Sequence, residues 1–223
     1  HREAARFWGI TDPATAFQVH AILGGTPGYR DLLPAPTPQT LSEIDEWLAA
    51  GPLNPTSALF REDDYLLTEE RSLTDRSLYH SVVTAIADGN TSQASIAATL
   101  GREQRAVQHP LTALEEAGFI SRAEDALRAR RPIYALADPI VRFHHVVTRR
   151  DLARFEERRA LEAWADARPR FAAARLSDEM GQRVGVHADP QPTNRRRREA
   201  SVADQVAVVI DQEDQLGDPV DHR

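Results

Sequence analysis

The sequence of 223 residues contains no cysteine and no lysine. Without cysteine there is no disulfide framework, thiolate metal ligand or cysteine nucleophile, which fits a reducing compartment and predicts a cytoplasmic protein. Without lysine there is no Schiff-base chemistry and no P-loop, because a P-loop needs a lysine ammonium that reaches the β- and γ-phosphates. All 27 basic residues are arginine. We therefore predict that this chain neither binds nor hydrolyses ATP. We assign it no catalytic residue, cofactor or metal, and we leave open whether it is an enzyme.

Long apolar runs are also missing from the sequence. No stretch approaches the ~20 consecutive apolar residues of a membrane span, so no membrane partner is expected. Hydrophobic residues make up 41% of the chain, which is enough for the packed core of one large or two small domains. The formal net charge of −7 argues against a protein that coats nucleic acid with its whole surface.

The best-defined stretch, residues 72–137, has the pattern of three helices followed by a β-hairpin. Apolar residues recur at helical spacing in three segments that glycine turns separate, with Gly101 between the second and third. Gly118 follows the third segment, where a left-handed cap would end a helix. Two β-prone runs, 119–122 and 133–136, flank an arginine-rich loop, and this order predicts a winged helix-turn-helix domain. The inward positions that we expect are Leu78, Val82, Ile86, Ile96, Leu100, Val107, Leu111 and Leu114.

Residues 1–71 are predicted to form a helical subdomain with proline-rich connections. The pair Asp12-Pro13 predicts a helix start, with an N-cap and a proline at the first helical position. Residues 24–29 are glycine-rich like a phosphate loop, but they follow a helix and lack lysine, so a helix C-cap and turn is favoured. A cluster of acids further on is compatible with a paired-carboxylate site, although a solvated acidic rim is the ordinary explanation. Its members are Glu62, Asp63, Asp64, Glu69 and Glu70.

Residues 138–180 are expected to form a helical extension. The adjacent His144 and His145 would point to different faces of an α-helix, so a place at the core edge or in an interface is favoured over metal ligation. A charged helix is expected over 151–167, and Pro169 is expected to end it.

Taken in order, several segments resemble the C-terminal part of the archaeal-type ATPases. Residues 20–29 are similar to the GG-x-P-x-Y signature that follows the nucleotide-binding core of that family. Residues 110–120 and 131–134 resemble the family's third helix and wing, and 137–144 its D-P-x-x-R-F segment. The resemblance covers roughly residues 1–180.

This resemblance implies a helical lid over 1–71, a winged helix over 72–137 and a C-terminal extension. It also implies that the ATPase core, and with it ATP binding, lies upstream of His1 or in another chain. We therefore expect an ATPase core as a partner and expect this chain to be a piece of a longer protein.

In the resembled family, the region beyond the wing often carries a nuclease-like αβ domain, in which a strand with an acidic residue precedes an acid-x-lysine pair. The β-prone run 206–210 is flanked by Asp204, Asp211 and Glu213. Because the lysine is missing and the chain stops soon afterwards, residues 181–223 are predicted to be disordered or a truncated remnant of such a domain.

The sequence supports one main function and two alternatives. In the first, the third helix enters the major groove of duplex DNA while wing arginines contact phosphates. Residues 72–137 contain seven arginines and seven acids, and this zero net charge is unfavourable for binding DNA phosphates. It favours the alternative, a protein-interaction module that regulates an ATPase core or partner. A metal-dependent nuclease is a remote third. The candidate nucleic-acid-binding residues are Arg102, Arg105, Gln108, His109, Thr112, Arg122, Arg128, Arg130 and Arg131.

Overall fold

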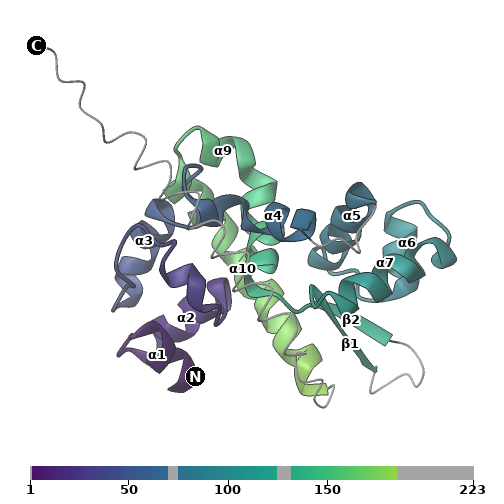
Figure 1. Ribbon diagram of the computed structural model, residues 1–223, viewed down its shortest axis with the longest axis horizontal. Helices are drawn as coiled ribbons and strands as arrows, with labels where there is room; N and C mark the ends of the chain where they lie inside the picture. The colour runs from purple at the N-terminus through teal and green to yellow at the C-terminus, as the bar shows by residue number, and fades with distance from the viewer. Residues whose placement is uncertain (1, 70–74, 125–131, 185–223) are drawn as a thin grey trace, which may run out of the picture.

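The computed structural model describes residues 2–69, 75–124 and 132–184 (Figure 1). This part of the chain is mainly helical, and its two strands form one antiparallel sheet, as the sequence predicts at that level. None of the described helices is long and apolar enough to cross a membrane. Residues 181–184, which were predicted to be disordered, instead form the end of the last helix, and the predictions for 185–223, including the run 206–210, lie outside the described residues.

The N-terminal part is built from short helices joined by 3-10 turns. Asp12 caps the second helix as predicted, because its Oδ2 accepts a hydrogen bond of 2.8 Å from the Thr15 amide. Gly24 ends that helix with φ 69°, and its amide donates a hydrogen bond to the His20 carbonyl. This confirms the prediction that a helix C-cap, and not a phosphate loop, begins at Gly24. The elements are α1 (Arg2–Trp8), α2 (Pro13–Leu23), η1 (Pro27–Arg30), η2 (Leu41–Glu43), α3 (Ile44–Ala50), η3 (Ala58–Arg61) and α4 (Glu62–Glu69).

The next described elements form what we call the helix–sheet unit, residues 75–124 and 132–136. Ser92 and Ser95 form a capping box at the start of its second helix, and Gly101, at φ 62°, makes the turn to the third. The two strands pair from Ile120 opposite Leu136 onward. Its elements are α5 (Arg76–Ala87), α6 (Gln93–Thr99), α7 (Gln104–Glu116), β1 (Ile120–Glu124) and β2 (Pro132–Leu136). Of the eight predicted inward residues, Val82, Ile86, Ile96, Val107, Leu111 and Leu114 are buried, and Leu78 and Leu100 are partly buried.

The C-terminal part differs from its prediction over 151–167. Instead of one helix there are two, separated at Arg158, whose φ of 63° is left-handed. The guanidinium of Arg158 donates to Asn54 Oδ1 at 3.2 Å, which ties this turn to the N-terminal part. The elements are α8 (Pro139–Phe143), the π-helical turn η4 (His144–Thr148), η5 (Arg149–Asp151), α9 (Leu152–Glu156) and α10 (Ala160–Val184).

Pro169 does not end α10, contrary to the prediction, and the helix continues through it to Val184. The hydrogen bond that the proline cannot make would go to the Ala165 carbonyl, and both residues are exposed, so water can satisfy that carbonyl. On the opposite side the buried stripe of Trp164 and Phe171 continues past the proline. Packing of that stripe outweighs the lost hydrogen bond.

One continuous hydrophobic core connects the three parts. The long helix α10 contacts α3 on one side and both strands on the other (Figure 1). The helix α8 contacts α2. The Phe143 ring lies 5.9 Å from the Trp164 ring and 5.4 Å from the Phe171 ring, centroid to centroid. The C-terminal part therefore lies between the N-terminal helices and the helix–sheet unit.

Candidate functional site

The exposed side of α7 carries the residues that the sequence analysis selected for nucleic-acid contact. Arg105, Gln108 and Thr112 are exposed, while Val107 and Leu111 on the opposite side are buried. This separation follows from the helical period, because residues at i, i+3 and i+7 share one face. His109 is exposed beside them, and its Nδ1 lies 3.4 Å from the Tyr79 hydroxyl of α5.

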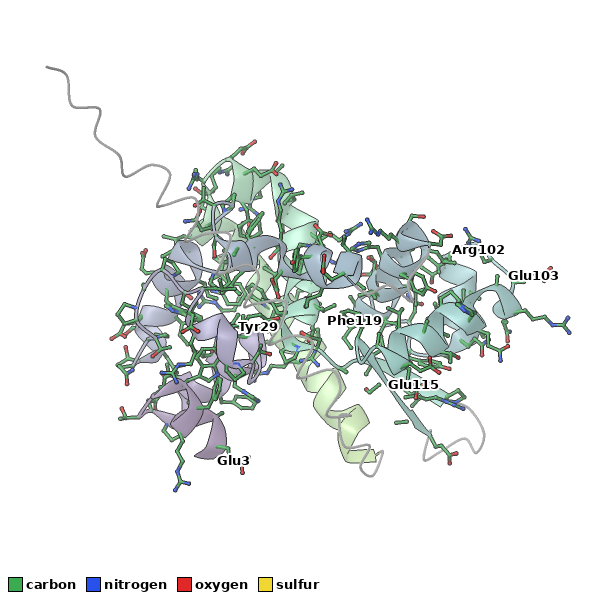
Figure 2. The ribbon with its side chains drawn as sticks, in the orientation of Figure 1. Glu3, Tyr29, Arg102, Glu103, Glu115 and Phe119 are labelled. Atoms are coloured by element: carbon green, nitrogen blue, oxygen red, sulfur yellow. The ribbon has the colours of Figure 1, made fainter. Side chains whose placement is uncertain are left out.

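Two further selected arginines lie on the surface of the same unit. Arg102 follows the turn before α7, and Figure 2 shows it with Glu103 at the outer end of the molecule. Arg122 is exposed on β1. The remaining three wing positions, Arg128, Arg130 and Arg131, lie outside the described residues.

The arginines of this surface have no carboxylate partner within the described part of the chain. That holds for Arg102, Arg105 and Arg122, whereas many arginines elsewhere are paired. For example, the Arg154 guanidinium lies 2.8 Å from Asp166. Further such pairs are Arg61–Glu156, Arg150–Asp88, Arg159–Glu162, Arg168–Asp45 and Arg170–Asp151. The cationic groups on the helix–sheet unit are thus available to an external anion.

Acidic residues also occur at both ends of α7. Glu103 is its exposed N-cap residue, and Glu115 and Glu116 form its last turn (Figure 2). The surface is therefore mixed in charge, with Arg105 in the first turn of the helix, Gln108 and Thr112 in its middle, and carboxylates at the N-cap and in the last turn.

A second polar site lies in the interior, where the sequence predicted an acidic rim. Two of the five acids of that predicted rim, Glu62 and Asp63, are 0% exposed, so the prediction is wrong for them. The Tyr29 hydroxyl donates to Glu62 Oε1 at 3.2 Å. Asp63 instead faces histidines from other elements. Because α4 has its apolar stripe on the side of Leu66 and Leu67, its first turn carries these acids into the core.

The expectation that His144 and His145 point to different faces is also wrong. His144 Nδ1 lies 2.9 Å from Asp63 Oδ1, and His145 Nε2 lies 3.3 Å from Asp63 Oδ2. Both histidines are buried in η4, where the Arg149 amide donates to the His144 carbonyl in an i→i+5 bond. The wider π turn reduces the angle between successive side chains, so neighbouring histidines can reach one carboxylate.

The helix–sheet unit completes this cluster from α5. His80 Nε2 lies 3.7 Å from Asp64 Oδ1, and the Thr84 hydroxyl contacts His145 Nδ1 at 3.0 Å. The ligand atoms of Asp63, His80 and His145 all lie within 4.8 Å of one another. We call Asp63, Asp64, His80, His144 and His145 the histidine–aspartate cluster.

Burial and proximity set the charge states in this cluster. Burial alone would raise the pKa of the Asp63 carboxyl, but the hydrogen-bond contact with the His144 imidazole lowers it well below its usual range. Burial lowers the pKa of both His145 and His80, although Asp63 acts in the opposite direction. At neutral pH the cluster thus combines the ionised carboxylate of Asp63 with neutral imidazoles at His80 and His145.

The chain matches no protein-family model, and searches of curated proteins and of solved structures found no significant match.

Proposed function

We propose that the helix–sheet unit is a winged helix that binds duplex DNA, with α7 in the major groove and the wing arginines on phosphates. The observation that carries this proposal is the exposed α7 surface, on which Arg105 and Gln108 lie one turn apart and Arg105 has no carboxylate partner among the described residues. Arginine and glutamine both make bidentate contacts with base edges, to guanine and adenine respectively. Arg102, which precedes α7, and Arg122, exposed on β1, would contact the backbone.

The wider assignment extends the same proposal. We propose that the chain is the C-terminal part of an archaeal-type ATPase, with residues 1–71 as a lid beside the winged helix. The ordered motifs of 20–29, 110–120 and 137–144 support it. The winged helix would then couple an ATPase core, upstream or in another chain, to DNA.

A second candidate function is supported by the charge of the unit. Over residues 72–137 the seven arginines and seven acids cancel, and the carboxylates at both ends of α7 would oppose a continuous phosphate backbone. In this second function the unit docks on a protein partner, such as the ATPase core, and regulates it.

Fluorescence anisotropy of the whole chain with a labelled mixed-sequence duplex tests the DNA proposal, at about 50 mM and about 200 mM salt. Changing both Arg130 and Arg131 to alanine should weaken binding to every duplex and reduce the log–log salt slope by up to ~2 units. Arg105→Ala should cost about 1–3 kcal/mol on a preferred site and reduce discrimination between sites.

Arg61→Ala is the matched control, because Arg61 is an exposed arginine that lies outside the helix–sheet unit. It should bind DNA like the wild type. Absence of binding by the folded chain at the lower salt overturns DNA binding. If the same chain then co-purifies with an ATPase core, and Arg105→Ala weakens that association, the protein-interaction function replaces it.

A further inference from the structure

The geometry points to a binding site for one divalent transition-metal ion of the Zn²⁺ class, held by Asp63, His80 and His145. These residues come from α4, α5 and η4, so the site lies where the three parts of the molecule meet. It lies apart from the exposed surface of α7 and does not depend on the proposed DNA binding.

The first argument is the tautomer of His145. The Thr84 hydroxyl donates its single proton to the His80 carbonyl at 2.8 Å, the i−4 position of its own helix. In its 3.0 Å contact with His145 Nδ1, the same oxygen must then accept, so Nδ1 carries the proton. The neutral ring consequently has its lone pair on Nε2. That nitrogen faces Asp63 Oδ2 at 3.3 Å, so two lone pairs oppose each other.

A positive species between these two atoms removes the repulsion, and it can be a proton or a metal ion. The cluster contains four buried polar atoms that receive no hydrogen bond of good geometry within the described chain: both Asp63 oxygens, His80 Nδ1 and His145 Nε2. A proton on Nε2 would serve only Asp63 and His145. A metal ion can accept a lone pair from all three side chains, and their convergence within 4.8 Å favours it.

The donor set and its spacing select the metal. Two neutral imidazoles with one carboxylate suit Zn²⁺ and related ions rather than Mg²⁺ or Ca²⁺, which prefer oxygen. Bonds of about 2.1 Å in a tetrahedral site place ligand atoms ~3.4 Å apart, close to the observed 3.3 Å between Asp63 Oδ2 and His145 Nε2. His80 is 18% exposed and comes from the neighbouring helix, so a side-chain rotation can bring it to the same distance.

The surroundings also match those of a metal site. A histidine ligand usually donates its second ring N–H to an oxygen, as His145 Nδ1 does to Thr84. The other oxygen of Asp63 lies 2.9 Å from His144 Nδ1, so the carboxylate keeps an imidazole neighbour on the side away from His145. Asp64 lies beside His80 and its side chain is 48% exposed. On this side, a water molecule or an oxygen of the Asp64 carboxylate would be the fourth ligand of the metal ion.

Titration of the whole, chelator-treated chain with Co²⁺, a coloured substitute for Zn²⁺, tests the proposal. We expect one Co²⁺ per chain, visible absorption bands of a four-coordinate ion, and displacement of Co²⁺ by Zn²⁺. Thermal stability should rise with added Zn²⁺, because only the folded chain assembles the three ligands.

His80→Ala removes a ligand that is partly exposed, so the variant should fold, and its Co²⁺ affinity should fall by more than about 100-fold, beyond the effect of an outer-shell change. His109→Ala is the matched control, an exposed histidine outside the cluster, and should bind Co²⁺ like the wild type. If circular dichroism shows that His80→Ala is unfolded, Thr84→Val replaces it, with an expected loss of about 10- to 100-fold. The proposal is overturned if the folded wild type binds neither Co²⁺ nor Zn²⁺, or if the folded ligand-site variant binds Co²⁺ as tightly as the control.

Discussion

A single hydroxyl, that of Thr84, decides which nitrogen of His145 carries a proton. Its contacts with the His80 carbonyl and with His145 Nδ1 occupy both its donor and one of its acceptor positions. This arrangement leaves His145 Nε2 without a proton, so that its lone pair is directed at Asp63. At the scale of residues, the properties of the cluster thus depend on a side chain that bears no charge.

Thr84→Val keeps the shape of this side chain and removes the hydroxyl. We expect the free energy of unfolding to fall by about 1–3 kcal/mol, because the buried N–H of His145 is left without an acceptor. Ser81→Ala is the control, since Ser81 on the same helix also donates to its i−4 carbonyl but its side chain forms no hydrogen bond with a histidine of the described residues. Its effect should stay within about 0.5 kcal/mol. Urea denaturation measures both, and equal losses would contradict the role assigned to Thr84.

Asp12 gives a prediction for the dependence of stability on pH. The hydroxyl of Thr15, followed by its amide, lowers the pKa of the Asp12 carboxyl. Because the folded-state pKa lies below the unfolded one, the stabilisation is fully present above the unfolded pKa and is lost as pH falls through the folded pKa. Asp12→Ala should therefore lower the Tm clearly at neutral pH and much less at about pH 3, below the ordinary aspartate range.

The comparison for Asp12 is Asp31→Ala, because Asp31 is an exposed aspartate of the same N-terminal part that caps no helix N-terminus. Its Tm difference from the wild type should be small at both pH values. A loss for Asp12→Ala that is the same at both pH values would show that the ionised carboxylate is not the stabilising form.

At the scale of elements, helices with explicit start and stop residues could be predicted from the sequence. The start of α2 at Pro13 and the turns at Gly24 and Gly101 follow from Asp12, proline and glycine, whose backbone preferences are local. The strand pair follows from two β-prone runs on either side of a loop. Local chemistry is sufficient there, because each signal acts within a few residues.

Other elements depend on contacts that are distant in the sequence and could not be predicted locally. The π turn η4 has no signature in the helical periodicity, so the convergence of His144 and His145 on Asp63 was missed. The available signals were an acidic pair at the start of a helix and an adjacent histidine pair, but nothing in the sequence connects them. The helix through Pro169 likewise depends on the burial of Trp164, which only the tertiary structure shows.

Two glycines allow the cost of backbone conformation to be separated from the cost of close packing. Gly24 and Gly101 have similar positive φ values of 69° and 62°. A Cβ on Gly24 would lie 3.2 Å from Pro139 Cγ, whereas a Cβ on Gly101 would meet nothing within 4 Å. Gly101→Ala should cost about 1–2 kcal/mol from the left-handed backbone alone. Gly24→Ala should cost more than that, because Pro139 at the start of α8 must move.

Chemical denaturation of both variants beside the wild type measures this difference. Gly25→Ala serves as a reference for alanine substitution without strain, since Gly25 is exposed, has no left-handed φ and would place its Cβ 3.6 Å from the His20 ring. If Gly24→Ala and Gly101→Ala lost the same stability, α2 and α8 would not be in tight contact at this position.

At the scale of the whole molecule, the three parts share one core although the sequence divides into distinct segments. The π turn η4 touches α5, and α10 touches α3 and both strands, so the C-terminal part is in contact with both of the others. The histidine–aspartate cluster draws on all three parts as well. We therefore expect the described part of the chain to unfold as one cooperative unit.

The last prediction tests this cooperativity with a substitution in the helix–sheet unit and a signal from elsewhere. The three tryptophans, Trp8, Trp47 and Trp164, all lie in the other two parts, so their fluorescence reports on those parts alone. Leu111→Ala removes a side chain of α7 that is 1% exposed and should lower the free energy of unfolding by about 2–5 kcal/mol. Because the core is continuous, the urea midpoint followed by tryptophan fluorescence should shift by the same amount as that followed by circular dichroism. The exposed Thr112→Ala, next to it on the same helix, should shift neither midpoint appreciably. A fluorescence midpoint that stays at the wild-type value while circular dichroism shows early loss of helix would mean that the helix–sheet unit unfolds by itself.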